Sequence, residues 1–357
     1  MTKLQRFQAA LRTTDAECAI ISSEINIRYL CSFDYTDGYL LIFPERAYLL
    51  ADFRYIEAVR AGVSDFEIIM PSGTMLEELK RLISEHGAHS AAIEDESISC
   101  AAFSRMGEAL SGITLCTGAS ELLREQREIK FDEELALIAR AQSITDAAFS
   151  HILGVISPDV TEKDVALEIE FFMRKMGAEC TAFDTIAVSG SSSSLPHGVP
   201  ADKKLSRGFL TLDFGARYKG YCSDMTRTVV IGKADEDMKK VYNTVLSSQT
   251  AALDAICEGM LCKDADEVAR RVIRDAGFGE CFGHSLGHGV GMYIHESPSL
   301  SPRAKQTDVL RRGNVVTVEP GIYIAGKYGC RIEDMIAIDH SGKLINFTKS
   351  TTELIEI

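Results

Sequence analysis

The sequence predicts an α+β fold in two domains, a small α/β domain and a larger domain in which helices back a curved antiparallel sheet. Three observations support this prediction. Residues 1–124 alternate short helices and strands. The charged segment 124–132 follows without apolar periodicity, and we therefore place the domains at residues 1–124 and 125–357. Beyond this segment, two helices, a connecting segment and a hairpin occur twice in the same order.

The elements of the first domain follow from apolar spacing and turn residues. Apolar residues three or four apart indicate helices, short apolar runs indicate strands, and Gly87 ends one helix. In chain order we expect a helix around 4–11, a strand at Cys18–Ile21, a hairpin of 39–43 and 47–50, a helix at 52–61, a strand at 66–70, a helix at 75–86, a strand at 91–94 and a helix at 100–110. The domain has no metal-spaced cluster and no glycine-rich phosphate loop. We expect it to shape a partner's active site or a dimer contact.

The second domain appears as two copies of one plan. In chain order we expect helices at 131–156 and 162–176, the latter capped by Thr161, a hairpin at 209–231, helices at 235–257 and 263–276, the latter ended by Gly277, and a hairpin at 315–338. Glu319 follows Asp213 by 106 residues, and Glu333 follows Asp224 by 109. These similar offsets suggest a duplicated half, with the two hairpins meeting about a pseudo-twofold axis in one sheet.

The first hairpin carries an acid on each arm. Its polar break at 217–220 is typical of a four-residue loop. If Ala216 faces Tyr221, then Asp213 faces Asp224 with about 5 Å between Cβ atoms. Like charges placed opposite each other destabilise a sheet, so this pair calls for a cation. The alternative is that one aspartate caps the turn and the other is solvated.

The second hairpin has the same design. Glu319 lies on one arm, Glu333 lies on the other, and the turn is predicted at 326–329. Four carboxylates without counter-charge would repel one another strongly, whereas two divalent cations would neutralise them.

Histidines provide the other candidate ligands. His284 and His288 have the spacing of a helical zinc pair, but four glycines in nine residues disfavour a helix and favour a close backbone approach. One histidine among four acids suits Mn²⁺, Co²⁺ or Fe²⁺ better than a structural Zn²⁺. His197 lies in a serine-rich, proline-flanked loop, which is either a plain surface loop or one that brings a proton-transferring group to the site.

Composition excludes several partner classes. The formal net charge of −14 argues against nucleic acid and anionic membrane surfaces. The ten cysteines contain no C-x-x-C pair, so we interpret them as reduced thiols. The sequence has no signal-peptide pattern and no apolar run that approaches a membrane span, which favours the cytoplasm.

These motifs together resemble a known family. The ordered set is Asp213, Asp224, His288, Glu319 and Glu333, within the strings LDFGARYKGYCSDMTRT, GHSLGHGVGMYIHE, VEPGIYI and CRIED. It resembles the "pita-bread" metallopeptidases, which include methionine aminopeptidase, prolidase and aminopeptidase P. The stretch SEINIRYLCSFDYTDGYLLIFPERAYLLADFRY in the first domain is similar to the creatinase-type N-terminal domain of the proline-specific members.

The resemblance implies a dinuclear site, with Mn²⁺ expected first and Co²⁺, Fe²⁺ or Zn²⁺ as alternatives. Asp224 and Glu333 would bridge both ions, Asp213 would complete one side, and His288 with Glu319 would complete the other. Metal ions of this kind generate hydroxide near neutral pH and polarise the scissile carbonyl. By the same resemblance, Glu319 also handles the proton of the attacking water.

Five further residues receive roles from the resemblance. His197 and His295 match histidines that steady the scissile amide and the tetrahedral intermediate. His284 matches a position that lines the prolyl pocket. Arg331, with Tyr323, matches an arginine that supports the first aspartate, although an ion pair to the acid cluster would explain it equally well.

The expected function is a cytoplasmic Xaa-Pro aminopeptidase, acting on proline-containing peptides as a homodimer. An Xaa-Pro dipeptidase is the alternative on the same site. Two more distant alternatives are a creatinase-like amidinohydrolase, which would work without metal, and a binding protein that keeps the fold without catalysis. The intact ligand set disfavours both of these.

Overall fold

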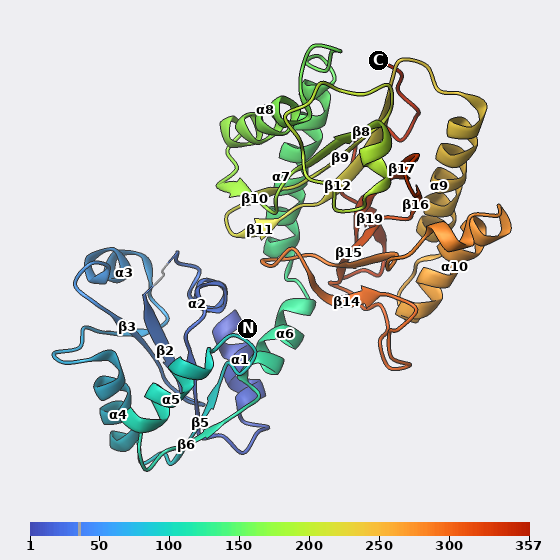
Figure 1. Cartoon of the computed structure of the whole chain (residues 1–357). Coiled ribbons are helices and arrows are strands. Elements are labelled where there is room, and N and C mark those ends of the chain that lie inside the picture. The colour runs from blue at the N-terminus through green and yellow to red at the C-terminus, as the bar shows by residue number, and fades with distance from the viewer. Residues whose placement is uncertain (35–36) are drawn as a thin grey trace. The chain divides into compact units, whose positions relative to one another are not determined.

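A computed structural model describes residues 1–34 and 37–357, and residue contacts divide it into two units, Met1–Arg127 and Glu128–Ile357 (Figure 1). Tyr35 and Thr36, which belong to the stretch similar to the creatinase-type domain, lie outside the described residues. Among the described helices, none combines the length and the apolar character that a membrane crossing requires.

The first unit is built on a six-stranded mixed sheet. The strand order is β4-β3-β2-β1-β5-β6, in which β1 runs antiparallel to β2 and parallel to β5. The strands are β1 (Cys18–Ile21), β2 (Gly38–Ile42), β3 (Ala47–Ala51), β4 (Glu67–Ile69), β5 (Ser90–Ile93) and β6 (Thr114–Cys116). The helices are α1 (Lys3–Leu11), α2 (Glu24–Cys31), α3 (Ile56–Gly62), α4 (Met75–Glu85), α5 (Cys100–Ala109) and α6 (Ala119–Glu128).

Sequence patterns predicted most of this unit and missed three elements. The strand Cys18–Ile21 was predicted with its exact ends, and α4 begins at Met75 as expected, where Thr74 and Glu77 form a capping box. Helix α2 and strand β6 were not predicted, because both are short and carry weak periodicity. Helix α6 also was not predicted; it occupies the first half of the charged segment 124–132 and buries Leu123.

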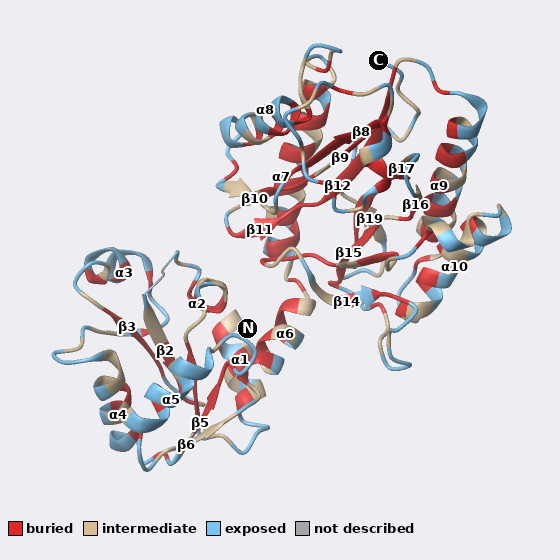
Figure 2. Cartoon of the chain, viewed as in Figure 1, coloured by how far each residue is buried: buried red, intermediate tan, exposed pale blue. Residues whose placement is uncertain are grey.

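The second unit contains two pairs of long helices. They are α7 (Asp132–Ile152) with α8 (Glu162–Lys175) and α9 (Glu236–Ala255) with α10 (Cys262–Asp275), each within four residues of its predicted ends. Thr161 caps α8 as predicted, since its hydroxyl accepts the backbone N–H of Asp164. The two pairs flank the strands from opposite sides (Figure 1), and the strands between them are largely buried (Figure 2).

The strands of this unit form several antiparallel ladders, and a backbone hydrogen bond from Glu333 N to the carbonyl oxygen of Thr226 at 3.1 Å joins the two hairpins. The two larger ladders have the orders β12-β9-β8 and β14-β13-β15-β18-β19, and the smaller ones are β11-β10-β7 and β16-β17. The strands are β7 (Cys180–Thr181), β8 (Ile186–Ser189), β9 (Gly208–Phe214), β10 (Ala216–Tyr218), β11 (Tyr221–Cys222), β12 (Met225–Ile231), β13 (Gly287–Gly289), β14 (Glu296–Leu300), β15 (Val315–Val318), β16 (Gly321–Ile324), β17 (Tyr328–Arg331), β18 (Asp334–Ile338) and β19 (Leu344–Asn346). Two 3₁₀ helices, η1 (Gly190–Ser194) and η2 (Gly279–Cys281), complete the unit.

The register of the first hairpin differs from the prediction. Asp213 pairs with Thr226, so the predicted direct pairing of Asp213 with Asp224 is wrong. The reason is the turn, which has two central residues rather than four. Lys219 and Gly220 both have positive φ, +46° and +85°, as a type I′ turn requires. Removing two residues from the loop moves every cross-strand partner by two positions.

The second hairpin also turns slightly earlier than predicted. Tyr323 pairs with Gly329 and Val318 with Asp334, around a three-residue turn at 325–327. In both hairpins the ladder is interrupted next to the acids. These interruptions separate β9 from β10, β11 from β12, β15 from β16 and β17 from β18.

Candidate metal centre

Asp213 and Glu319 each point away from the helix pair that their own strand packs against. In β9, Leu210 and Leu212 pack into the core formed with α7 and α8, so Asp213 faces the opposite side of the strand. In β15, Val318 packs into the core formed with α9 and α10, and Glu319 follows it with the opposite orientation. The same alternation gives the acids of both hairpins a common face.

The candidate ligand atoms are close enough to share an ion. Asp224, His288 and Glu333 each offer one ligand atom, and these atoms lie within 4.8 Å of one another. His288 Nε2 is 3.6 Å from Asp224 Oδ2 and 3.4 Å from Glu319 Oε1. The histidine therefore faces acids of both hairpins.

Strand β13 brings His288 to this position between two glycines. A Cβ atom on Gly287 would lie 2.0 Å from the carbonyl oxygen of Thr317, and one on Gly289 would lie 2.2 Å from that of Ser297. Only glycine allows these approaches, which confirms the close backbone packing expected from the sequence.

His288 faces the acids as a neutral ring. Burial lowers its pKa to about 4, so its contacts with the acids are not ion pairs near neutral pH. Its Nδ1 lies 3.1 Å from the carbonyl oxygen of Gly289, and this contact fixes the ring proton on Nδ1. Nε2 then presents a lone pair to the oxygens of Asp224 and Glu319. A cation between these atoms would accept the lone pair of Nε2 and offset the negative charge of the acids.

Burial and mutual repulsion make the charged forms of the acids unfavourable. Burial and the charges of the neighbouring carboxylates raise the pKa of Asp224 and of Glu333 well above the ordinary range. Burial raises the pKa of Glu319 to about 8, although the positive charge of Arg331 acts in the other direction. One arginine does not offset four carboxylates, of which Asp224 and Glu333 are buried and Asp213 and Glu319 are partly buried.

Arg331 connects the two hairpins through side chains. It lies on β17 and forms a short ion pair with Asp213 on β9. Its Nε donates to Thr226 Oγ1 at 2.9 Å, and that hydroxyl donates to Glu333 Oε2 at 2.7 Å. Its NH1 group donates to the Tyr323 hydroxyl at 2.6 Å. One guanidinium thus orients an acid of each hairpin and a tyrosine.

Asp213 keeps one oxygen available. Its Oδ2 pairs with Arg331, whereas its buried Oδ1 has no hydrogen-bond partner among the described residues. An unsatisfied buried carboxylate oxygen is costly unless something else binds it. Together with the close group of Asp224, His288 and Glu333, this oxygen fits a divalent cation.

The remaining predicted histidines surround the same cavity, which has a volume of about 750 Å³. The ring centroid of His295 lies 4.4 Å from that of His288. His284 has a pKa lowered to about 4 by burial, so its Nε2 accepts a hydrogen bond from the Tyr323 hydroxyl at 3.0 Å. His197 lies on the exposed loop that follows η1 and also lines the cavity.

Comparisons with known proteins give the same picture. The model of metallopeptidase family M24 matches residues 136–340, and that of the creatinase/prolidase N-terminal domain matches residues 3–129. The chain belongs to metallopeptidase family M24. An uncharacterized peptidase of Bacillus subtilis is 40% identical over 99% of both chains. An Xaa-Pro dipeptidase of Pyrococcus horikoshii is 44% identical over 66% of both.

Solved structures resemble this M24 enzyme over nearly its whole length. An Xaa-Pro dipeptidase from Bacillus anthracis has a TM-score of 0.95 at 40% identity and covers 99% of each chain. An X-Pro aminopeptidase from Thermotoga maritima has a TM-score of 0.91 at 34% identity, covering 98% of this chain and all of the other. The resemblance to the pita-bread metallopeptidases and the predicted fold class are therefore confirmed. The roles of individual residues stay predictions.

Sequence reasoning missed two threonines of this metallopeptidase that orient its acids. Thr226 links Arg331 to Glu333, as described above. Thr317 Oγ1 donates to Glu319 Oε1 at 3.2 Å and accepts the backbone N–H of His288 at 3.1 Å. Each threonine lies two residues from an acid on the same strand face. That spacing is visible in the sequence, but β-branched residues in strands need no special explanation.

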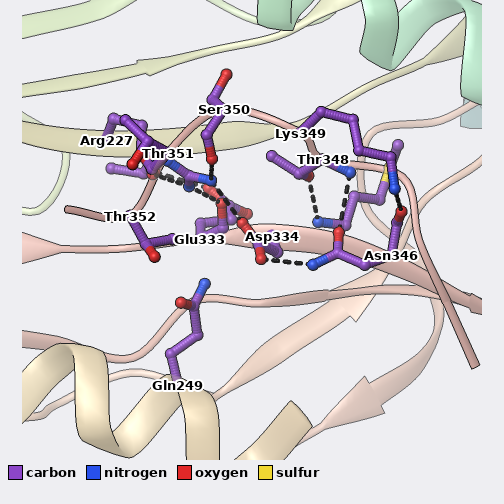
Figure 3. A network of polar contacts seen from close by, with 12 residues as sticks. Arg227, Gln249, Glu333, Asp334, Asn346, Thr348, Lys349, Ser350, Thr351 and Thr352 are labelled. Atoms are coloured by element: carbon purple, nitrogen blue, oxygen red, sulfur yellow. Dashed lines mark hydrogen bonds and ion pairs between the residues drawn. The ribbon is translucent and has the colours of Figure 1, made fainter.

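A second buried arginine was also missed. Arg227 on β12 is 1% exposed and forms an ion pair with Asp334 at 2.7 Å. Its other bonds go to backbone carbonyl oxygens, including that of Glu333 at 2.6 Å (Figure 3). The remaining carbonyls are those of Thr226, Ser350 and Thr351. Arg227 thus fixes the backbone that carries Glu333.

Proposed function

We propose that this M24 metallopeptidase is an exopeptidase that removes the first residue of peptides whose second residue is proline. Relatives and structural neighbours that carry the names Xaa-Pro dipeptidase and X-Pro aminopeptidase support the substrate class. The observation that carries the proposal is the buried group of Asp224, His288 and Glu333, open to a cavity of about 750 Å³.

Five residues would hold two divalent ions, with Mn²⁺ proposed first. They are Asp213, Asp224, His288, Glu319 and Glu333. Bound ions supply a nucleophilic hydroxide near neutral pH and polarise the scissile carbonyl. Glu319 accepts the proton of the attacking water on a carboxylate oxygen, while the Thr317 hydroxyl holds Glu319 Oε1 in place.

The histidines bind and orient the substrate in this proposal. His197 and His295, which line the cavity, hydrogen-bond to the scissile amide and to the oxygen that becomes negative. His284 lines the pocket for the proline ring, and its hydrogen bond from Tyr323 fixes the plane of its imidazole. Proline has no N–H and a fixed φ, so a site shaped for its ring can select it.

The cavity offers room for longer peptides, which is why we propose an aminopeptidase first. Its lining runs from the acids to Lys163, Leu167 and Glu170 on α8, so it continues beyond the reacting groups. Its volume lies in the upper part of the range of about 300–1,000 Å³ that is usual for ligand pockets. A dipeptidase is the second candidate, because several similar proteins carry that name.

Hydrolysis of Ala-Pro and Ala-Pro-Ala by chelator-treated enzyme, before and after Mn²⁺ addition, tests the proposal. We expect cleavage of the tripeptide to return with Mn²⁺, together with two ions per chain by elemental analysis. Cleavage of Ala-Pro alone would replace the aminopeptidase by the dipeptidase. Full activity in the presence of chelator would contradict metal catalysis and favour the amidinohydrolase-like alternative. Failure to cleave either peptide with ions bound would reject the proline specificity.

A further inference from the structure

The loop that carries His197 has local hydrogen bonds, within η1 and at Gly198, but its position in the unit depends on contacts with other elements. It spans residues 190–200 between β8 and β9, begins with η1 and is rich in serine, glycine and proline. His197 is exposed, and five consecutive residues of the loop from Pro196 to Pro200 line the cavity. A flexible loop would present this histidine in many positions, which is incompatible with orienting a substrate.

Both ends of the loop converge on one buried carboxylate, that of Glu162. Its Oε1 accepts the backbone N–H of Ser189 at 2.6 Å and the Ser189 hydroxyl at 2.9 Å. Its Oε2 accepts the backbone N–H of Ala201 at 3.1 Å. Glu162 is 0% exposed, and Lys203 Nζ lies 3.2 Å from Oε1 as its counter-charge. Ser189 directly precedes the loop and Ala201 directly follows it, so one side chain closes the loop at its base.

Charge-assisted bonds of this kind are stronger than neutral ones and fix geometry in a dry environment. The middle of the loop is held separately by the second hairpin. Gly329 N donates to Ser193 Oγ at 3.0 Å, and Arg331 NH1 donates to the carbonyl oxygen of Pro196 at 3.3 Å. The Glu162 carboxylate therefore joins both ends of the loop to α8, beside backbone hydrogen bonds from Lys163 to Ala201 and from Glu162 to Lys203.

The other half of the unit contains a similar device. Asp266 on α10 is 1% exposed, and its Oδ1 accepts the backbone N–H of Leu286 at 2.9 Å. It pairs with Arg270, which donates to the carbonyl oxygen of His284 at 2.8 Å. Asp266 follows Glu162 by 104 residues, close to the offsets between the paired acids of the hairpins. In each half, a buried acid on the second helix holds a segment that contains a cavity histidine.

We infer that Glu162 is a positioning residue that acts through His197, in addition to any contribution to folding. The inference rests on the proposed function, because His197 must contact substrate for its position to affect catalysis. Glu162 itself does not line the cavity. Its effect on turnover should therefore vanish when the imidazole of His197 is absent.

A double-mutant cycle with Glu162→Gln and His197→Ala tests the inference on the Mn²⁺-loaded enzyme with Ala-Pro-Ala. We expect Glu162→Gln to lower kcat by about 10- to 100-fold, since misplacing a group by about 1 Å can cost 100-fold. In the His197→Ala background the same substitution should change kcat by less than about twofold, because coupled residues are not additive. The metal content should be unchanged.

Glu134→Gln is the matched control. Glu134 is 1% exposed and accepts a backbone N–H and a hydroxyl, from Phe131 and Tyr221, neither of which belongs to the loop. Its effect on kcat should be the same with and without His197→Ala. If Glu162→Gln and His197→Ala also multiply independently, Glu162 is only structural and the inference is wrong.

Hydrogen exchange gives a readout that does not depend on activity. The amides of Ser189 and Ala201 should lose protection in Glu162→Gln, whereas the amide of Leu286 should keep it. Unchanged protection at Ser189 and Ala201 would also overturn the inference. If Glu162→Gln does not fold, Ser189→Ala replaces it in both experiments; it removes the hydroxyl bond to Glu162 together with the acceptor of the Ser206 N–H. A wild-type enzyme that cleaves no Xaa-Pro peptide would reject the proposed function instead. The exchange result would then show only whether Glu162 holds the ends of the loop.

Discussion

Two buried arginines cross between the hairpins in opposite directions, and they bind different parts of the chain. Arg331 reaches from β17 to three side chains, those of Asp213, Thr226 and Tyr323, and to one backbone carbonyl oxygen, that of Pro196. Arg227 reaches from β12 to Asp334 and to four backbone carbonyl oxygens. The two arginines carry the same charge and are both buried, so they differ only in the groups that they bind. Arg331 orients side chains that face the cavity, whereas Arg227 joins segments of backbone.

Glu333 lies where the two networks meet. Thr226, which Arg331 holds, donates to its carboxylate, and Arg227 donates to its carbonyl oxygen. The comparison therefore predicts that chemistry and folding can be separated by substitution. Changes on the Arg331 side should affect turnover more than stability, and changes on the Arg227 side should do the reverse.

The largest effect is expected from Glu333→Ala. It removes a candidate ligand of both ions, so turnover of Ala-Pro-Ala should fall below detection and the metal content should drop. Elemental analysis of the purified variant and the peptide assay measure the two effects. Glu134→Gln, a buried acid outside the group, should retain its ions. A Glu333→Ala protein with unchanged metal content would contradict the site assignment.

The next effect is on stability. Arg227→Met should lower the free energy of unfolding by about 3–5 kcal/mol, because the buried carboxylate of Asp334 loses its positively charged partner and keeps only the Asn346 amide. Denaturant unfolding measures the change. The exposed pair of Arg312 with Glu258, at 2.9 Å, provides a control, and Arg312→Met should cost less than about 1 kcal/mol. If Arg227→Met is as stable as the parent but inactive, the separation of the two networks fails.

The candidate ligands could be predicted from the sequence because each motif is local. The acids, His288 and the glycines around it lie in short strings, and strand alternation gives their common face. The register of the first hairpin could not be obtained this way, because it depends on Lys219 adopting a positive φ. Lysine rarely does so, and the sequence therefore favoured a longer loop.

Residues that act by contacting distant parts of the chain were also beyond the sequence. Arg227 and Glu162 are charged residues in ordinary strand and helix patterns, where a solvent-exposed position is the natural expectation. Their partners lie 107 and 27 residues away, at Asp334 and Ser189. Only tertiary packing identifies them as buried, and without an observed partner no functional role could be assigned.

The smallest expected effect is that of replacing each arginine by lysine, and it tests the difference between the two arginines most directly. Arg331→Lys keeps the charge beside Asp213 but cannot reproduce the planar set of bonds to Asp213, Thr226 and Tyr323. Removing such supports from candidate ligands typically costs about 10- to 100-fold in activity or metal affinity. We expect kcat for Ala-Pro-Ala to fall by that factor, with little change in the denaturant midpoint. Arg227→Lys is the matched control and should show the reverse, a lower midpoint with kcat per folded enzyme nearly unchanged. Equal losses of kcat in both variants would mean that the two networks act as one unit.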